Sequence, residues 1–263
     1  LGAVQLSSLE NLFPGINPYT SFAYFDSNYG VMHEKQLMIG ECTCGAKVQP
    51  GPAPGKRLFY SAELSRMALE YCTTARHAIV LIDFLIKEYG YYGPGDTLHL
   101  GDPEEGWVIE MCAYEAYGSD GGWVAQRVPD DHYFVAANQF RIRDVPASAS
   151  LTSPGEFCAS PSTASPAADL VCSANLFTVC KTNGWIAPDA EELDWLPTVS
   201  NGEYAHPYYS LRRVWRAMSK VKPSQYFSPW VENGFTREYP FSIRPDKKLS
   251  VADVAAIYRD HYE

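Results

Sequence analysis

The sequence predicts an α+β fold in which antiparallel strands and paired amphipathic helices pack in layers. Residues 106–140 hold three apolar, β-prone runs that are separated by turn signals. Residues 61–89 hold two consecutive stretches with helical periodicity. The 263 residues are 46% hydrophobic and 20% charged, which is enough apolar material for a sizeable core. We therefore expect a single domain over residues 1–263.

The first third of the chain alternates strand and helix signals. Residues 1–18 are expected to form an irregular lead-in with weak strand character. Alternating polarity predicts strands over 20–26, 29–33 and 36–41, with a tight turn at 42–45, and Pro and Gly predict a loop over 48–56. A first helix begins at Ser61, and a second is capped by Thr74 and ends at Gly90.

The remaining two thirds begin with a predicted meander. Its strands are Gly106–Ala113, Trp123–Val128 and Tyr133–Phe140. Residues 146–168 are rich in Ser, Pro and Ala, which predicts an exposed loop. Helices are expected from Ser165 to Gly184, over Ser210–Lys220 and after Ser250, where Asp253 completes a capping box. The last helix is expected to bury four residues: Val251, Val254, Ala255 and Tyr258.

Charge and hydropathy exclude two classes of partner. The formal net charge of −10 is unsuited to nucleic acid, whose phosphates require basic surfaces. No apolar run reaches the roughly 18 residues of a membrane span, so we expect no transmembrane segment.

Seven cysteines are many for a chain of this length. Their spacing lacks the paired CxxC pattern of a zinc site, so we expect neither a metal nor another cofactor. We predict a disulfide-bonded chain of the secretory pathway, located in the lysosome or outside the cell. The alternative is seven separate core cysteines.

A collinear series of motifs covers most of the chain and resembles a known family. It includes Glu105-Gly106-Trp107, the run WVAQRVPDDH at 123–132 and ANQF at 137–140. Further stretches lie at 24–34, 39–43, 202–206, 209–215, 239–242 and 259–263. The whole pattern resembles the dipeptidase family of cysteine N-terminal-nucleophile hydrolases, whose relatives include the secernins.

The resemblance implies a four-layer αββα sandwich that is incomplete without flanking segments. Members of this family act through a cysteine that is the first residue of the mature chain, with its α-amino group as the base. This sequence begins with Leu1, and none of its cysteines is terminal. We therefore expect it to be the central piece of a longer precursor, which is either cut by proteolysis into several chains that stay together or represented here only by this part. Its partners would be the remaining chains of that precursor and a small peptide substrate, and a homo-oligomer is a further candidate assembly.

The resemblance also implies catalytic residues. Asn138 matches an asparagine beside the nucleophile, where its amide could hold the amine or the oxyanion; the alternative is a strand-end turn. His33 stands where relatives have asparagine. Glu41 and Thr43 flank Cys42, which replaces a serine, and backbone N–H groups there could bind the oxyanion. The alternative is a disulfide-stapled turn.

Two adjacent arginines are candidates for substrate binding. Arg212 or Arg213 could hold a peptide carboxylate through paired hydrogen bonds, although an exposed basic helix explains them equally well.

We therefore predict part of a dipeptidase-like cysteine hydrolase that cleaves small peptide bonds through a thioester. The nucleophile would come from outside this chain, which alone would be inactive. The alternative is an inactive relative that serves as a structural or binding subunit, which Leu1, His33 and Cys42 favour. A metal-dependent hydrolase is a weaker third hypothesis.

Overall fold

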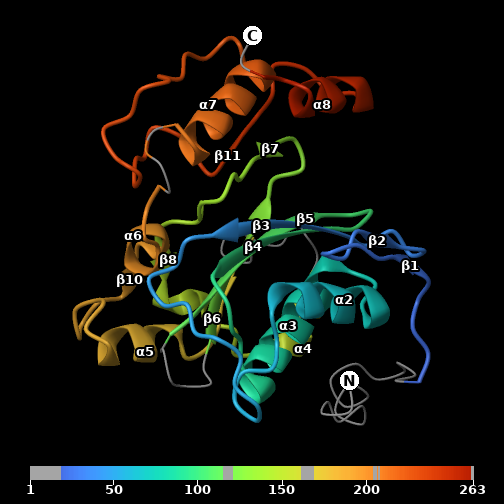
Figure 1. The fold of residues 1–263 in the computed structure, drawn as a ribbon, viewed down its shortest axis with the longest axis vertical. Coiled ribbons are helices and arrows are strands. Elements are labelled where there is room, and N and C mark those ends of the chain that lie inside the picture. Colours follow the sequence, from blue (N-terminus) through green and yellow to red (C-terminus); the bar gives the residue numbers. More distant parts are fainter. Residues whose placement is uncertain (1–18, 115–120, 161–168, 204–205, 207, 262–263) are drawn as a thin grey trace.

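A seven-stranded antiparallel sheet forms the centre of the structure, in the strand order β1-β2-β3-β4-β5-β6-β9 (Figure 1). The computed structural model describes residues 19–114, 121–160, 169–203, 206 and 208–261. Two helices, α2 and α3, cover one face of the sheet, and the C-terminal part with α7 and α8 lies beyond the other. The predicted α+β class is confirmed. The lead-in predicted for residues 1–18 lies outside the described residues.

The strands of the main sheet differ in length. Their bounds are β1 Tyr24–Phe25, β2 Met32–His33, β3 Met38–Cys44, β4 Gly95–Gly101, β5 Gly106–Ala113, β6 Gly121–Val128 and β9 Leu170–Cys172. The hairpin of β5 and β6 is confirmed, and both strands are almost wholly buried because both faces of the sheet are covered. The turn predicted at 42–45 is wrong, because β3 continues to Cys44 in register with β4.

The third strand of the predicted meander is also wrong. Only β7, Tyr133–Phe134, is a strand, and it pairs with β11, Ser242–Ile243, instead of β6. Asn138 has a φ of 54°, which strand geometry excludes. The place beside β6 is taken by β9. A second short ribbon joins β8, Val145–Pro146, to β10, Glu192–Leu193.

The two predicted helices under the sheet are confirmed as α2, Ser61–Tyr71, and α3, Ala75–Tyr89. Thr74 caps α3 by accepting the N–H of His77 at 3.2 Å, and Gly90 ends it with a φ of 74°. Apolar side chains of both helices pack on the sheet residues Ile39, Leu98, Ile109 and others in one core cluster.

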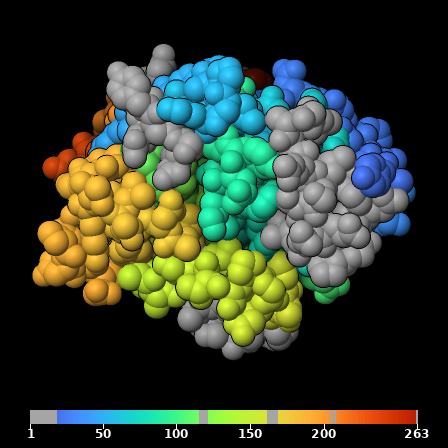
Figure 2. Space-filling model, turned by 90° about the horizontal axis from the view of Figure 1, so that it is seen from below, coloured from blue at the N-terminus to red at the C-terminus, as the bar shows by residue number. Residues whose placement is uncertain are grey.

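The other helices depart from prediction in part. They are α4 Pro154–Ala159, α5 Leu176–Thr182, α6 Trp195–Val199, α7 Ser210–Val221 and α8 Val251–Tyr258, with a 3₁₀ turn at Ala147–Ala149. Figure 2 shows part of α3 at the lower surface, next to the segments of α4 and α5. The segment 146–168, which was predicted as an exposed loop, contains the last residue of β8, the 3₁₀ turn and α4. Residues 161–168 lie outside the described residues.

Two helix predictions need correction. The helix expected from Ser165 to Gly184 is interrupted by β9, whose apolar Leu170–Cys172 run pairs with β6, and only α5 remains helical. The helix after Ser250 is present with its capping box, but it buries none of its residues, and Val251 is 88% exposed. The basic helix over Ser210–Lys220 is confirmed as α7. Among the described helices, none has the length and apolarity to cross a membrane.

Packing of α3 on the sheet should contribute strongly to stability. Ile82 is completely buried in this layer, so Ile82→Ala should lower the free energy of unfolding by about 3 kcal/mol. Urea denaturation would measure this loss. The control is Val251→Ala on exposed α8, expected within about 0.5 kcal/mol of wild type. Similarly small losses of stability at both positions would contradict the packing of α3 on the sheet.

Candidate functional site

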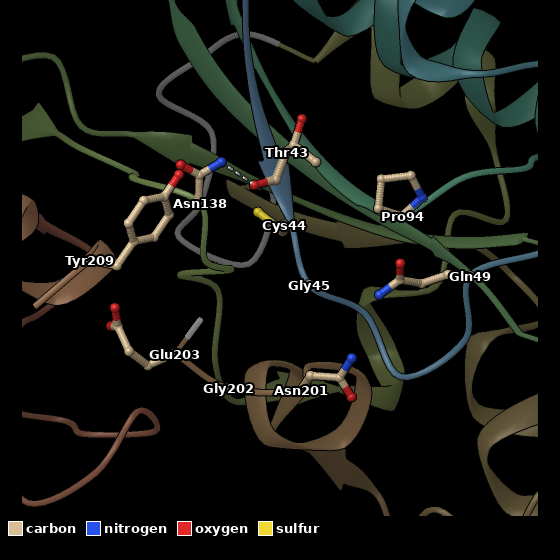
Figure 3. A pocket seen from close by; sticks show the side chains of 10 residues that line it. All are labelled: Thr43, Cys44, Gly45, Gln49, Pro94, Asn138, Asn201, Gly202, Glu203 and Tyr209. Atoms are coloured by element: carbon tan, nitrogen blue, oxygen red, sulfur yellow. Dashed lines mark hydrogen bonds between the residues drawn. The ribbon is translucent and has the colours of Figure 1, made fainter. Parts of the chain in front are cut away.

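Asn138 connects three separate parts of the chain. Its backbone N–H donates to Cys42 Sγ at 2.9 Å, and its Nδ2 donates to the carbonyl oxygen of Thr43 at 2.7 Å (Figure 3). Its Oδ1 accepts a hydrogen bond from Arg213 Nη2 at 3.0 Å. The structure thus brings together Asn138, Thr43 and Arg213, three of the residues predicted from the sequence. The left-handed backbone at Asn138 lets one residue make all of these contacts.

A cavity of about 500 Å³ opens beside Asn138. Asn138, Tyr209 and Glu203 lie along one side, and Pro94 and Gln49 lie on the other (Figure 3). The rest of its lining comes from Thr43, Cys44, Gly45, Asn201 and Gly202. The cavity therefore lies where the end of β3, the 138 turn and the start of α7 meet.

Glu203 shapes the wall of this cavity at α7. Its carboxylate accepts the backbone N–H groups of Ser210 and, at 2.9 Å, of Leu211. These are among the first N–H groups of the helix, which have no partner within it. A carboxylate at this end of the helix also interacts favourably with the helix dipole. Glu203 thereby fixes the start of the helix that carries Arg213.

Cys42 presents a thiol to the same turn. The Cys44 thiol is the main cause that lowers the pKa of Cys42, and the amide N–H groups of Asn138 and Gln139 act in the same direction. Burial raises the pKa of Cys44 well above its usual range. The alternative interpretation of this segment as a disulfide-stapled turn is wrong, because both cysteines are free and belong to a paired strand.

Glu110 holds the turn from beneath, and the sequence prediction missed it. This β5 carboxyl is fully buried and accepts the N–H of Arg141 at 2.5 Å and that of Ile142 at 3.2 Å. Burial raises the pKa of Glu110 to about 8. The available signal was a carboxylate within the apolar run Val108-Ile109-Glu110-Met111. Such a group is retained only where it has partners.

The strand that carries Glu41 and Thr43 directs backbone groups toward the site. Ile39 donates its N–H to Val31, on the edge of β3 that faces away from β4. Because backbone groups alternate along a strand, the N–H groups of Glu41 and Thr43 face that same edge. Among the described strands, β2 pairs with β3 only at Met38. The Thr43 hydroxyl meanwhile donates to Glu41 Oε1 at 2.6 Å.

The two predicted arginines point in different directions. Arg213 contacts Asn138 and also donates to the carbonyl oxygen of Tyr209 at 2.7 Å. Arg212 instead places its guanidinium over aromatic rings, 4.8 Å from Trp230 and 5.1 Å from Trp215. Only Arg213 belongs to the Asn138 cluster.

His33 lies away from the cluster. It is buried, its Nε2 bonds the carbonyl oxygen of Cys72 at 2.6 Å, and its Nδ1 accepts the N–H of Lys35 at 2.9 Å. These contacts use both ring nitrogens to hold β2 against the segment after α2. Its neighbour across the turn, Leu37, is six residues from Thr43, about 20 Å along an extended strand. The structure does not bring His33 together with Asn138.

The side chains of Asn138, Arg213 and Cys42 thus meet at the turn beside the cavity. Residues 17–263 match the family model described as Peptidase family C69, so the chain belongs to this peptidase family. The resemblance to the dipeptidase family seen in the sequence is thereby confirmed.

Named relatives agree with this assignment. The chain is 27% identical over 214 residues to the probable dipeptidase B of Lactococcus lactis, covering 76% of this chain and 36% of that protein. It is 28% identical over 200 residues to a probable dipeptidase of Salmonella dublin, covering 76% of this chain and 40% of that protein. A dipeptidase of Bifidobacterium longum is 23% identical over 204 residues, covering 75% of this chain and 34% of that protein. The chain thus spans less than half the length of these relatives.

The comparisons and the structure correct the prediction made from the cysteines. The matching relatives are bacterial dipeptidases and not lysosomal or secretory-pathway proteins, so the predicted location is wrong. All seven cysteines are free, and six are buried, so the predicted disulfides are also absent. Buried thiols behave as small apolar side chains, which is the alternative interpretation of their number. Among the described residues, no group of three or more metal-ligating side chains is placed to hold an ion.

Glu110 should make the stability of the turn depend on pH. Its pKa in the folded state is raised, so its contribution is complete below about pH 4.5 and is lost as the pH rises through about 8. The free energy of unfolding of wild type relative to Glu110→Gln should therefore fall over this range. Urea titrations at several pH values would measure it.

Glu110→Ala tests the cap itself. It leaves two buried backbone N–H groups without an acceptor and should cost about 3 kcal/mol. A pH-independent difference between wild type and Glu110→Gln, together with a negligible cost for Glu110→Ala, would contradict the role assigned to this carboxyl.

Proposed function

We propose that this chain supplies the walls and anchoring groups of a cysteine-type dipeptidase. The enzyme would cleave small peptides through a thioester, and the nucleophilic sulfur would come from a segment outside these 263 residues. Membership of the peptidase family and the dipeptidase names of the relatives support the reaction class. The relatives' greater length supports a contribution from further segments.

The contact between Asn138, Thr43 and Arg213 beside the cavity is the observation that carries this proposal. A tetrahedral intermediate needs hydrogen-bond donors that are fixed before the reaction begins. The Asn138 amide is held at both ends, and the N–H groups of Glu41 and Thr43 face the same edge of β3. An added strand on this edge would bring a sulfur nucleophile close to these donors.

Arg213 has the better geometry of the two candidate substrate-binding arginines. Its guanidinium is oriented by the carbonyl oxygen of Tyr209 and by Asn138 Oδ1. It would keep the Asn138 amide in its productive orientation and add positive charge near the cavity. A substrate carboxylate would be attracted to this end of the cavity.

The finer fold assignment belongs to the same proposal. In a four-layer sandwich, a second sheet would stack on the face of the main sheet opposite α2 and α3. The ribbons β7–β11 and β8–β10 are the pieces of this chain available for that second sheet. Segments outside this chain would have to supply the rest.

The test uses the full-length protein and unblocked dipeptides. Wild type should hydrolyse them, and a thiol-alkylating reagent should abolish the activity while a chelator leaves it unchanged. Asn138→Ala removes an oxyanion donor and should lower kcat about 100-fold to 1,000-fold. The control is Arg212→Lys, expected within about twofold of wild type because Arg212 stacks on rings away from Asn138.

Two results would count against the proposal. Full activity in Asn138→Ala would remove this amide from the reaction. A folded full-length wild type without thiol-dependent hydrolysis would favour the non-catalytic alternative.

A further inference from the structure

A polar cluster lies within the apolar layer between the sheet and helices α2 and α3. The register of β3 and β4 places Thr43 opposite Asp96, and Glu41 is the diagonal neighbour two residues away. The same face carries Ile39 and Leu98, which belong to the core cluster with both helices. Asp96 is completely buried, and its Oδ1 has no hydrogen-bond partner among the described residues.

The Tyr91 hydroxyl lies between two oxygen atoms, and this geometry favours a protonated Asp96. The Tyr91 hydroxyl lies 2.6 Å from the carbonyl oxygen of Pro94 and 2.5 Å from Asp96 Oδ2. A tyrosine hydroxyl has one proton and can donate only one of these two bonds. A carbonyl oxygen cannot donate, so both contacts can be hydrogen bonds at once only when Asp96 Oδ2 carries a proton and donates it to Tyr91. In that arrangement Asp96 Oδ2 donates to Tyr91 and Tyr91 donates to Pro94, whose ring lines the cavity.

A neutral Asp96 avoids placing a second negative charge beside the Glu41 carboxyl group. Two charged carboxylates in one buried site repel each other, so one of the pair keeps its proton. Glu41 then remains a full acceptor for the Thr43 hydroxyl at 2.6 Å. Thr43 in turn carries the carbonyl oxygen that holds the Asn138 amide at 2.7 Å. A continuous set of contacts therefore joins Asp96 to Asn138.

We propose that Asp96 is a positioning residue that acts as a neutral carboxylic acid: by remaining uncharged beside Glu41, it keeps Thr43 and the Asn138 amide in place. Its effect on peptide hydrolysis rests on the proposed function. The protonation state of Asp96 can be tested independently of that function. Deprotonation of Asp96 would place two negative charges together, push Glu41 away and free the Thr43 hydroxyl.

The surroundings of Asp96 fit this role. The groups that face it are Glu41 from β3, Tyr91 after α3, and Tyr60 and Ser61 at the start of α2. Tyr60 extends the cluster to Tyr29, with the two hydroxyls 3.3 Å apart. Burial, followed by the neighbouring Glu41, raises the pKa of Asp96 to about 9. The cluster should therefore be intact at neutral pH.

Infrared spectroscopy tests the protonation state without any assay of activity. At pH 7 the wild-type protein should show the C=O stretch of a buried carboxylic acid, which is absent from Asp96→Asn and disappears from wild type as the pH rises through about 9. Glu110→Gln is the control that identifies the band of the other buried acid. Wild-type and Asp96→Asn spectra that coincide in this region at pH 7 would overturn the proposal.

Dipeptide hydrolysis by the full-length protein tests the positioning role. Wild-type kcat should fall about tenfold per pH unit above pH 9. Asp96→Asn, which cannot ionise, should lack this decline, whereas Asp96→Leu should lose at least about tenfold at pH 7. An unchanged alkaline decline in a folded Asp96→Asn would overturn it. Absence of activity in every variant would instead count against the proposed function and leave the infrared result decisive.

Discussion

The turn at 138–142 depends on one buried carboxyl group. Glu110 accepts the N–H groups of Arg141 and Ile142 in a place that water does not reach. Two unpaired N–H groups there would cost several kcal/mol, so the turn is stable only with this acceptor. The turn then sets the left-handed backbone of Asn138 and directs its side chain to Thr43 and Arg213. The cavity has its shape because these two contacts hold β3, the turn and α7 together.

The parts of the fold that could be predicted are those with a strong local period. Helices α2, α3 and α7 and strand β5 repeat apolar residues at helical or strand spacing, and the structure has them where expected. Strand β4 was missed because Gly95, Asp96 and His99 weaken its strand character. β4 takes its place in the sheet by pairing with β3, which is distant in sequence, and with β5, which follows after a turn. α8 is exposed, so apolar residues at helical spacing do not by themselves show that another element covers that face of the helix.

The site was predictable only in part, and for a different reason. Asn138, Thr43 and Arg213 came from the family resemblance, because an asparagine in a turn and an arginine in a basic helix have ordinary local explanations. Nothing local separates Arg213 from Arg212; the rotation of α7 toward the turn decides which one meets Asn138. His33 has the right residue type for catalysis, but its ring closes a backbone contact. The cysteines were misinterpreted because their number carries no information on the distances between them.

The two buried acids explain why carboxyl groups occupy positions that amides could also fill. Cys42, Thr97 and Glu110 lie opposite one another on three neighbouring strands, so Glu110 is on the face of the sheet that bears Cys42. Asp96 lies on the other face, which α2 and α3 cover. Glu110 meets fixed N–H donors, which its carboxyl oxygens accept. The Tyr91 hydroxyl lies against both Pro94 and Asp96, and the neutral Asp96 that we propose would donate its proton to this hydroxyl. Each acid thus provides the hydrogen-bonding groups required on its own face of the sheet, and the end of β3 is held on both faces.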